Sequence, residues 1–365
     1  MTSKQQQDMG EATPCWRSIG PGIATFFLPL IALFLVIQAL WILLPAEWFE
    51  TRTLSTLDIS ALKLKGFARV IDGGMSFSIM SAAIWGAGLV AGVLSFIVMR
   101  RTLSARQTVA AWVIAASVGF LVACWEKNLR GTECESSYGS TTVHVDKNEG
   151  FRPVVIDNVI CVAEHRLSPD TRVLGTTQWM IIFNTFIGFV GAAVVMGAFG
   201  VLAMRYGNWS DAARLRRRLA DFRTLTLMAS VLFVLNALVT KALVSWTQGL
   251  LASEDDAASF GRLGNALLNY WAAQASTVLI VALSLAAIFI QIDIGGAVNR
   301  EAGRRRREVQ RHYTETQGDE DLAAAKWQDE NELSFNSATV VTATIGTIAP
   351  FLAGPAVDLV TKVLH

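Results

Sequence analysis

Six long apolar stretches limit what this chain can fold into more than any other feature of its sequence. They cover residues 23–44, 77–99, 108–125, 179–204, 225–246 and 267–292. A helix needs about 20 mainly apolar residues to cross the hydrocarbon core of a bilayer. Charged residues make up 17% of the chain, against roughly 25% in soluble domains. The pattern predicts an all-α polytopic membrane protein with six transmembrane helices.

Arginine marks alternate ends of these stretches, and segment 204–223 alone contains six arginines. Segments 100–106, 204–223 and 297–311 hold 15 Lys and Arg in 42 residues, whereas 46–75, 126–176 and 251–264 hold 11 in 95. Positive residues near span ends resist translocation. We therefore expect the first three segments, and with them the N-terminus, to be cytoplasmic.

This sidedness divides the chain into six parts. The expected parts are a cytoplasmic N-terminus (1–20), membrane helices one to three (21–125), a small extracytoplasmic loop subdomain (126–176), membrane helices four to six (177–296), a charged cytoplasmic segment (297–337) and an apolar C-terminal segment (338–365). Runs of β-branched residues in the loop subdomain predict a few short strands. The acidic stretch 318–332 is expected to be a solvated helix or linker.

The C-terminal segment has two interpretations. Residues 338–356 carry no charge, but they are rich in threonine and include Pro350, which would interrupt a helix. The segment either lies at the membrane interface as an amphipathic or re-entrant element, or it forms a seventh span.

The second stretch contains Gly88 and Gly92 in a GxxxG arrangement. Small residues at this spacing let helix backbones approach closely within a bilayer. They predict a helix-packing face, either between helices of one chain or between copies.

Two cysteines, Cys134 and Cys161, share the loop subdomain. In an oxidising compartment they are candidates for a disulfide bond. A metal site formed with His144 and His165 is an alternative, although the spacing does not match ordinary zinc patterns. Unpaired thiols are the third possibility.

Polar residues gather in the outer halves of the last three stretches: Asn184, Asn236, Thr240, Lys241 and Gln274. Such residues are costly in lipid and often mark a solute pathway. One interpretation is a polar outer vestibule that attracts anions through Lys241. The other is that Lys241 extends to the membrane interface and the asparagines join helices by hydrogen bonds.

Charged residues at the inner end of the sixth stretch have simpler interpretations. Asp293 is expected to be solvated. Arg304, Arg305, Arg306 and Arg307 either stop translocation of the span or attract anionic lipid headgroups.

No catalytic motif is present: the sequence lacks a Walker A loop, HExxH and GxSxG. All four histidines lie outside the apolar stretches, which argues against haem ligation in the membrane. We expect no enzymatic activity, no cofactor, no metal ion and no nucleic-acid partner.

Three classes of membrane protein fit these features. A channel or pore-like assembly, formed by a homo-oligomer, is favoured by the Gly-rich helices and the polar cluster. A signalling or scaffold protein with a sensing outer loop and a cytoplasmic tail is the first alternative, and a small-solute secondary transporter is the second. Arginine outnumbers lysine 23 to 8, which suggests a bacterial inner membrane protein.

Overall fold

The computed structural model describes six long helices, two short strands and one short helix near the C-terminus. The described residues are 16–43, 52–54, 67–129, 141–143, 173–204, 212–249, 254–310, 325–331 and 333. The long helices are α2 (Trp16–Leu43), α4 (Phe67–Thr102), α5 (Ala105–Leu129), α7 (Val173–Ala203), α8 (Ala212–Gly249) and α9 (Glu254–Gln310). Each expected apolar stretch coincides with one of them.

Five of these helices are long and apolar enough to cross a membrane, as expected of an integral membrane protein. Their candidate spans are Gly73–Thr102, Ala105–Cys124, Met180–Ala203, Ala212–Trp246 and Gln274–Arg304. The described side chains of α2 include a shorter apolar segment, Gly20–Ala32.

The helices extend well beyond the apolar stretches. α8 begins at Ala212, so most of the arginine-rich segment 204–223 is helical rather than a loop. α9 has 57 residues, about 85 Å at 1.5 Å per residue. It continues through the acidic segment 251–264 from Glu254 and through the basic segment 297–311 to Gln310. Ala, Leu, Arg and Glu all favour helix, so a span does not need to end where its apolar residues end.

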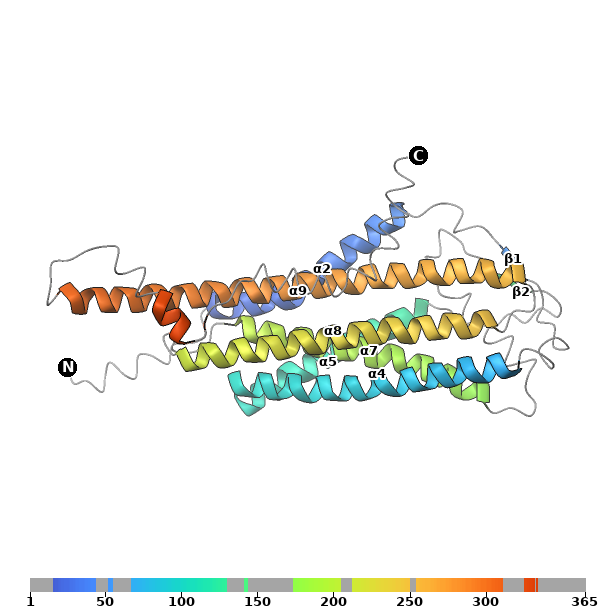
Figure 1. The fold of residues 1–365 in the computed structure, drawn as a ribbon, viewed down its shortest axis with the longest axis horizontal. Coiled ribbons are helices and arrows are strands. Elements are labelled where there is room, and N and C mark those ends of the chain that lie inside the picture. Colours follow the sequence, from blue (N-terminus) through green and yellow to red (C-terminus); the bar gives the residue numbers. More distant parts are fainter. Residues whose placement is uncertain are drawn as a thin grey trace.

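The helices run up and down alternately, and α7 lies in the middle, where it contacts the other five (Figure 1). More of α7 is buried than of any other candidate span. The end at which α7 finishes and α8 begins carries Arg100, Arg101, Arg216 and Arg218. We call it the basic end.

Glycines in and around α7 explain its central place. A Cβ atom on Gly119 of α5 would lie 2.7 Å from the carbonyl oxygen of Phe189 in α7. A Cβ atom on Gly22 of α2 would lie 2.7 Å from the carbonyl oxygen of Gly200. The backbones of α5 and α2 therefore touch that of α7 because these positions carry no side chain.

The two glycines of the GxxxG arrangement face different helices of the same chain. A Cβ atom on Gly88 would lie 2.5 Å from Ile187 of α7. Gly92 faces Trp112 of α5, whose indole nitrogen donates a hydrogen bond to the Gly92 carbonyl at 3.2 Å. Both contacts are helix packing within one chain.

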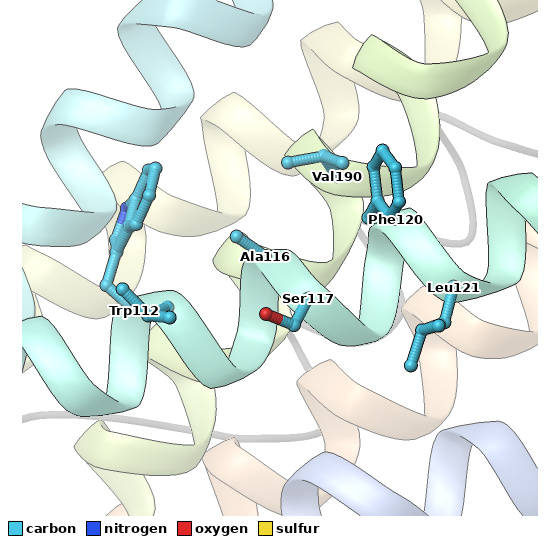
Figure 2. A pocket seen from close by; sticks show the side chains of 7 residues that line it. Trp112, Ala116, Ser117, Phe120, Leu121 and Val190 are labelled. Atoms are coloured by element: carbon cyan, nitrogen blue, oxygen red, sulfur yellow. The ribbon is translucent and has the colours of Figure 1, made fainter.

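An open groove runs along α5 beside α7 (Figure 2). Its volume is about 500 Å³, and its lining residues are Trp112, Val113, Ala116, Ser117, Phe120, Leu121 and Val190. Of these side chains, only that of Ser117 carries a hydroxyl group. The lining of the groove is therefore mainly apolar.

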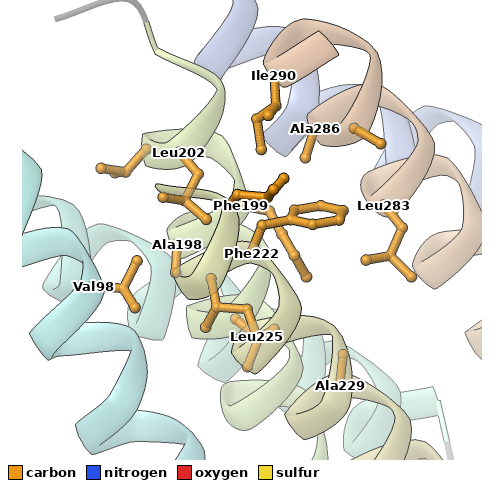
Figure 3. Packing of buried hydrophobic residues seen from close by; sticks show 14 of the residues in the cluster. Val98, Ala198, Phe199, Leu202, Phe222, Leu225, Ala229, Leu283, Ala286 and Ile290 are labelled. Atoms are coloured by element: carbon orange, nitrogen blue, oxygen red, sulfur yellow. The ribbon is translucent and has the colours of Figure 1, made fainter. Parts of the chain in front are cut away.

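The largest cluster of buried apolar side chains lies in the half of the bundle near the basic end. Phe199 of α7 and Phe222 of α8 meet edge to face at 5.7 Å near its centre. Figure 3 shows Leu283 and Ile290 of α9 and Val98 of α4 packed around them. In lipid such a core is stabilised by close packing more than by exclusion of water.

Two three-residue strands pair at the end of the bundle opposite the basic end (Figure 1). β1 (Arg52–Leu54) and β2 (Thr141–Val143) are antiparallel, with Thr53 opposite Thr142. β2 belongs to the expected loop subdomain, and β1 belongs to the loop before α4. The other residues of 130–172 lie outside the described part.

Candidate functional site

Asn184, one of the vestibule candidates, lies between α7 and α4. Its side chain accepts a hydrogen bond from the indole nitrogen of Trp85 at 2.6 Å and donates one to the Ser81 hydroxyl at 2.8 Å. Asn184 is only 5% exposed and Ser81 is fully buried. Both ends of the amide group are thus used to join two helices.

Two further vestibule candidates, Asn236 and Thr240, lie one turn apart on α8. The side-chain oxygen of Asn236 would be 3.6 Å from a Cβ atom on Gly188, so Asn236 faces α7 one turn from Asn184. Asn236 is nevertheless exposed, and Thr240 is half-buried. The Thr240 hydroxyl donates to the Asn236 backbone carbonyl at 2.9 Å.

The remaining two candidates lie farther out. Lys241 is exposed on α8, five residues before Trp246, which is 3% exposed and stacks on Phe77 of α4. Gln274 is half-buried on α9. The structure thus places Asn184 and Asn236 beside the same turn of α7, and leaves Lys241 on the outside of the bundle.

A second polar cluster, at the basic end, was not expected from the sequence. The guanidinium of Arg218 donates hydrogen bonds to the Leu202 carbonyl and, at 3.2 Å, to the Met204 carbonyl. These carbonyls end α7 and have no partner within their own helix. The positive charge also suits the negative end of the helix dipole.

Arg218 also binds Asp293 of α9 at 2.9 Å, and the carboxylate side chain is 3% exposed. The expectation that Asp293 is solvated was wrong. A carboxylate buried at this depth needs a cationic partner, and Arg218 supplies it. We call this group of Leu202, Met204, Arg218 and Asp293 the arginine clamp, which joins α7, α8 and α9.

Neighbouring arginines make similar contacts. Arg101 at the end of α4 forms an ion pair with Asp221 of α8, whose side chain is 10% exposed. Arg100 donates to the Leu103 carbonyl at 3.2 Å, beyond the end of α4. The basic residues that indicate sidedness in the sequence are therefore also partners in tertiary structure.

The segment after α9 returns to the basic end and packs on the bundle. Residues 325–330 form a short helix, and Leu333 beyond it is fully buried in the main cluster of apolar side chains. Arg216 of α8 donates to the Asn331 carbonyl at 3.1 Å and to the Glu330 carbonyl at 3.5 Å. As expected of a solvated helix, the described residues of 318–332 are exposed or half-buried, but this helix is also attached to the bundle through Arg216 and the neighbouring Leu333.

Several other candidates lie outside the described residues. Cys134 and Cys161 are among them, so their disulfide bond stays a prediction, as does the fate of segment 338–365. Arg304 is exposed and pairs with Glu301 at 3.0 Å. The side chains of Arg305, Arg306 and Arg307 are not described.

Within the described part of the chain, no group of three or more His, Cys, Asp or Glu side chains is arranged to hold a metal ion. Comparisons with protein-family models, curated proteins and solved structures found no match. Any function therefore has to be inferred from the residues of this chain and their geometry.

Proposed function

We propose that the protein is a channel or pore-like assembly with a polar vestibule at the end opposite the basic end. The observation that carries this proposal is the exposure of Asn236 and Lys241 inside the candidate span Ala212–Trp246. An amide and an ammonium group facing lipid within a span are costly. We infer that water or a second copy of the chain covers this part of α8.

A ring of copies would give the polar side chains of α8 contact with water and keep the apolar helix surfaces in lipid. If α8 faces the axis of a homo-oligomer, Asn236 and Lys241 contact water, and the apolar surfaces of the other helices remain in lipid. The positive charge of Lys241 would concentrate anions at the mouth of the pore.

The membrane topology that goes with this proposal has six spans, with α2 as the first. The basic end and the N-terminus are cytoplasmic, because Lys and Arg concentrate there, and the membrane is a bacterial inner membrane. Arg304 to Arg307 extend α9 toward anionic headgroups. If the binding of this segment to lipid vesicles does not depend on anionic lipid, the proposed contact of Arg304 to Arg307 with headgroups is wrong.

Residues 126–176 then form an extracytoplasmic subdomain, in which Cys134 and Cys161 are bridged. Such a bond would contribute on the order of 3 kcal/mol to that subdomain. Free thiols at both positions, detected by mass spectrometry of protein purified without reductant, would exclude the bond.

Anion flux into liposomes tests the vestibule. We expect Lys241→Ala combined with Asn236→Ala to reduce flux by up to about tenfold, because the local anion concentration falls. Lys241→Arg keeps the charge and should retain flux, and Leu238→Ala on the same helix is a neutral control. Wild-type flux in the double variant, with a normal oligomer and unfolding temperature, would refute the vestibule.

A signalling or scaffold role is the second candidate, and the docked segment 325–333 favours it, because a tail that packs on the bundle can transmit changes in helix packing. A secondary transporter is the third. Cross-linking in the membrane separates the classes, since the channel requires a closed ring of copies and a transporter can act as a monomer.

A further inference from the structure

Residues 325–333 form a short helix and a turn that pack against the bundle. The Leu333 amide donates to the Gln328 carbonyl at 2.9 Å, which is the long-range hydrogen bond of a Schellman-type helix end. The Gln328 side chain returns a bond to the Leu333 carbonyl at 3.1 Å. These bonds turn the chain so that Leu333 and Trp327 both reach the main apolar cluster.

The bundle offers a matching surface at the start of α8. Arg216 donates to the carbonyls of Glu330 and Asn331, which end the short helix and lack partners within it. The same chemistry holds α7 through Arg218, so two arginines on α8 each cap a helix. In Figure 1 the short helix lies against the start of α8 beside α9.

The charges of the two surfaces are complementary. The docked segment contains Asp329, Glu330 and Glu332 against a single basic residue, Lys326. The first turns of α8 hold four arginines between 212 and 218 and no acidic residue. Salt should therefore weaken the attraction.

The contact is nevertheless small. Leu333 is fully buried and Trp327 is half-buried, whereas Ala325, Lys326, Asp329 and Glu330 are exposed. Segments with few buried apolar contacts open without unfolding of the rest of the protein. The arginine clamp, by contrast, lies in the buried part of the same end.

We propose that the basic end is a docking site for an acidic amphipathic segment, and that the chain's own residues 325–333 occupy it reversibly as a strap. Release of the strap breaks the bonds of Arg216 to the Glu330 and Asn331 carbonyls, exposes Trp327 and leaves a cavity where Leu333 was packed. The docked and released states thus differ in the packing of the basic end. This inference does not depend on the proposed channel function.

Cysteine accessibility in the full-length protein tests the strap. In a background with Cys15, Cys124, Cys134 and Cys161 changed to Ser, Leu333→Cys and Lys326→Cys are treated separately with a maleimide. Docking predicts that position 333 reacts at least about tenfold more slowly than position 326, because labelling requires local opening.

Arg216→Gln then tests the proposed contact. It should raise the labelling rate at position 333 by about tenfold, since two bonds from a charged donor are lost. Arg217→Gln, at the exposed neighbouring position, removes the same charge without removing these two bonds, and should raise the rate much less. High salt should raise the rate most where Arg216 is present, because more of the attraction is there to be screened.

Two results would overturn the proposal. One is equal labelling at 333 and 326, which means that the segment is not docked. The other is labelling at 333 that rises only with global unfolding and does not respond to Arg216→Gln. If Leu333→Cys itself releases the strap, hydrogen exchange of 325–333 in the wild-type sequence replaces it, with Arg216→Gln and Arg217→Gln compared as before.

Discussion

Polar side chains of α8 have opposite environments near the two ends of the bundle. At the basic end, Arg218 and Asp293 are buried and bound to each other, and Arg218 also binds the carbonyls that end α7. Toward the other end, Asn236 and Lys241 are exposed within a candidate span. The same helix, α8, carries both arrangements. Partnered polar groups stabilise the bundle, whereas exposed ones require something outside the chain to contact them.

Breaking the arginine clamp tests this contrast most strongly. Arg218→Ala removes the guanidinium that is bonded to the buried Asp293, and we expect a loss of about 3–5 kcal/mol in the free energy of unfolding. Thermal or denaturant unfolding in detergent measures it. Arg217→Ala is the matched control, because Arg217 is exposed, and should stay within about 0.5 kcal/mol of wild type.

Removing the charges of both Arg218 and Asp293 shows how much of this loss comes from an unpaired charge. Arg218→Met with Asp293→Leu should recover part of the loss, because no unpaired charge remains. An Arg218→Ala variant as stable as Arg217→Ala would mean that the clamp contributes nothing to stability.

Two glycine variants test whether the helices are also closely packed in the part of the bundle away from the basic end. Gly119→Ala places a methyl group against backbone atoms of Phe189 and Val190, and should cost about 1–3 kcal/mol. Gly86→Ala meets nothing within 4 Å, so it should be neutral or slightly stabilising, as alanine favours helix. Unfolding of the two variants side by side gives the comparison, and equal stability would show that α5 can move away from α7.

The smallest expected effect comes from two asparagines. Asn184→Ala removes the partner of Trp85 and Ser81, and should destabilise the protein by about 1 kcal/mol. Asn236→Ala changes an exposed side chain of the same type and should leave unfolding unchanged. A larger loss from Asn236→Ala would mean that this residue, too, has a structural partner.

The helices over the apolar stretches were predictable from the sequence because apolar length is a local property, and five of them are long and apolar enough to cross a membrane. The helix ends were not, because arginines 214 to 223 lie outside the apolar stretches and are nevertheless helical, as the helix propensity of arginine allows. One helix start does have a local signal: Ser104 and Gln107 form a capping box at the start of α5. The Ser104 amide donates to the Gln107 side-chain oxygen at 3.1 Å, and the Gln107 amide donates to the Ser104 hydroxyl at 3.5 Å.

The polar partners could not be predicted in the same way. Asp293 stands 75 residues from Arg218 in the sequence, and no local pattern connects them. Leu333 is an isolated apolar residue in an acidic segment, without the periodicity that would show a buried face. Asn184 was identified as a costly polar residue within a span, but its partners Trp85 and Ser81 lie on a helix that is distant in the sequence.

The arginine clamp also has a consequence for how the protein is made. Arg218 bonds to carbonyls 14 and 16 residues earlier in the chain and to a carboxylate 75 residues later. Chains are synthesised from the N-terminus, and their parts fold in that order. The hairpin of α7 and α8 therefore has its polar contacts at the turn as soon as both helices are in the membrane. Arg218 keeps an uncompensated positive charge until α9 has been synthesised and inserted. Asp293 then neutralises this charge.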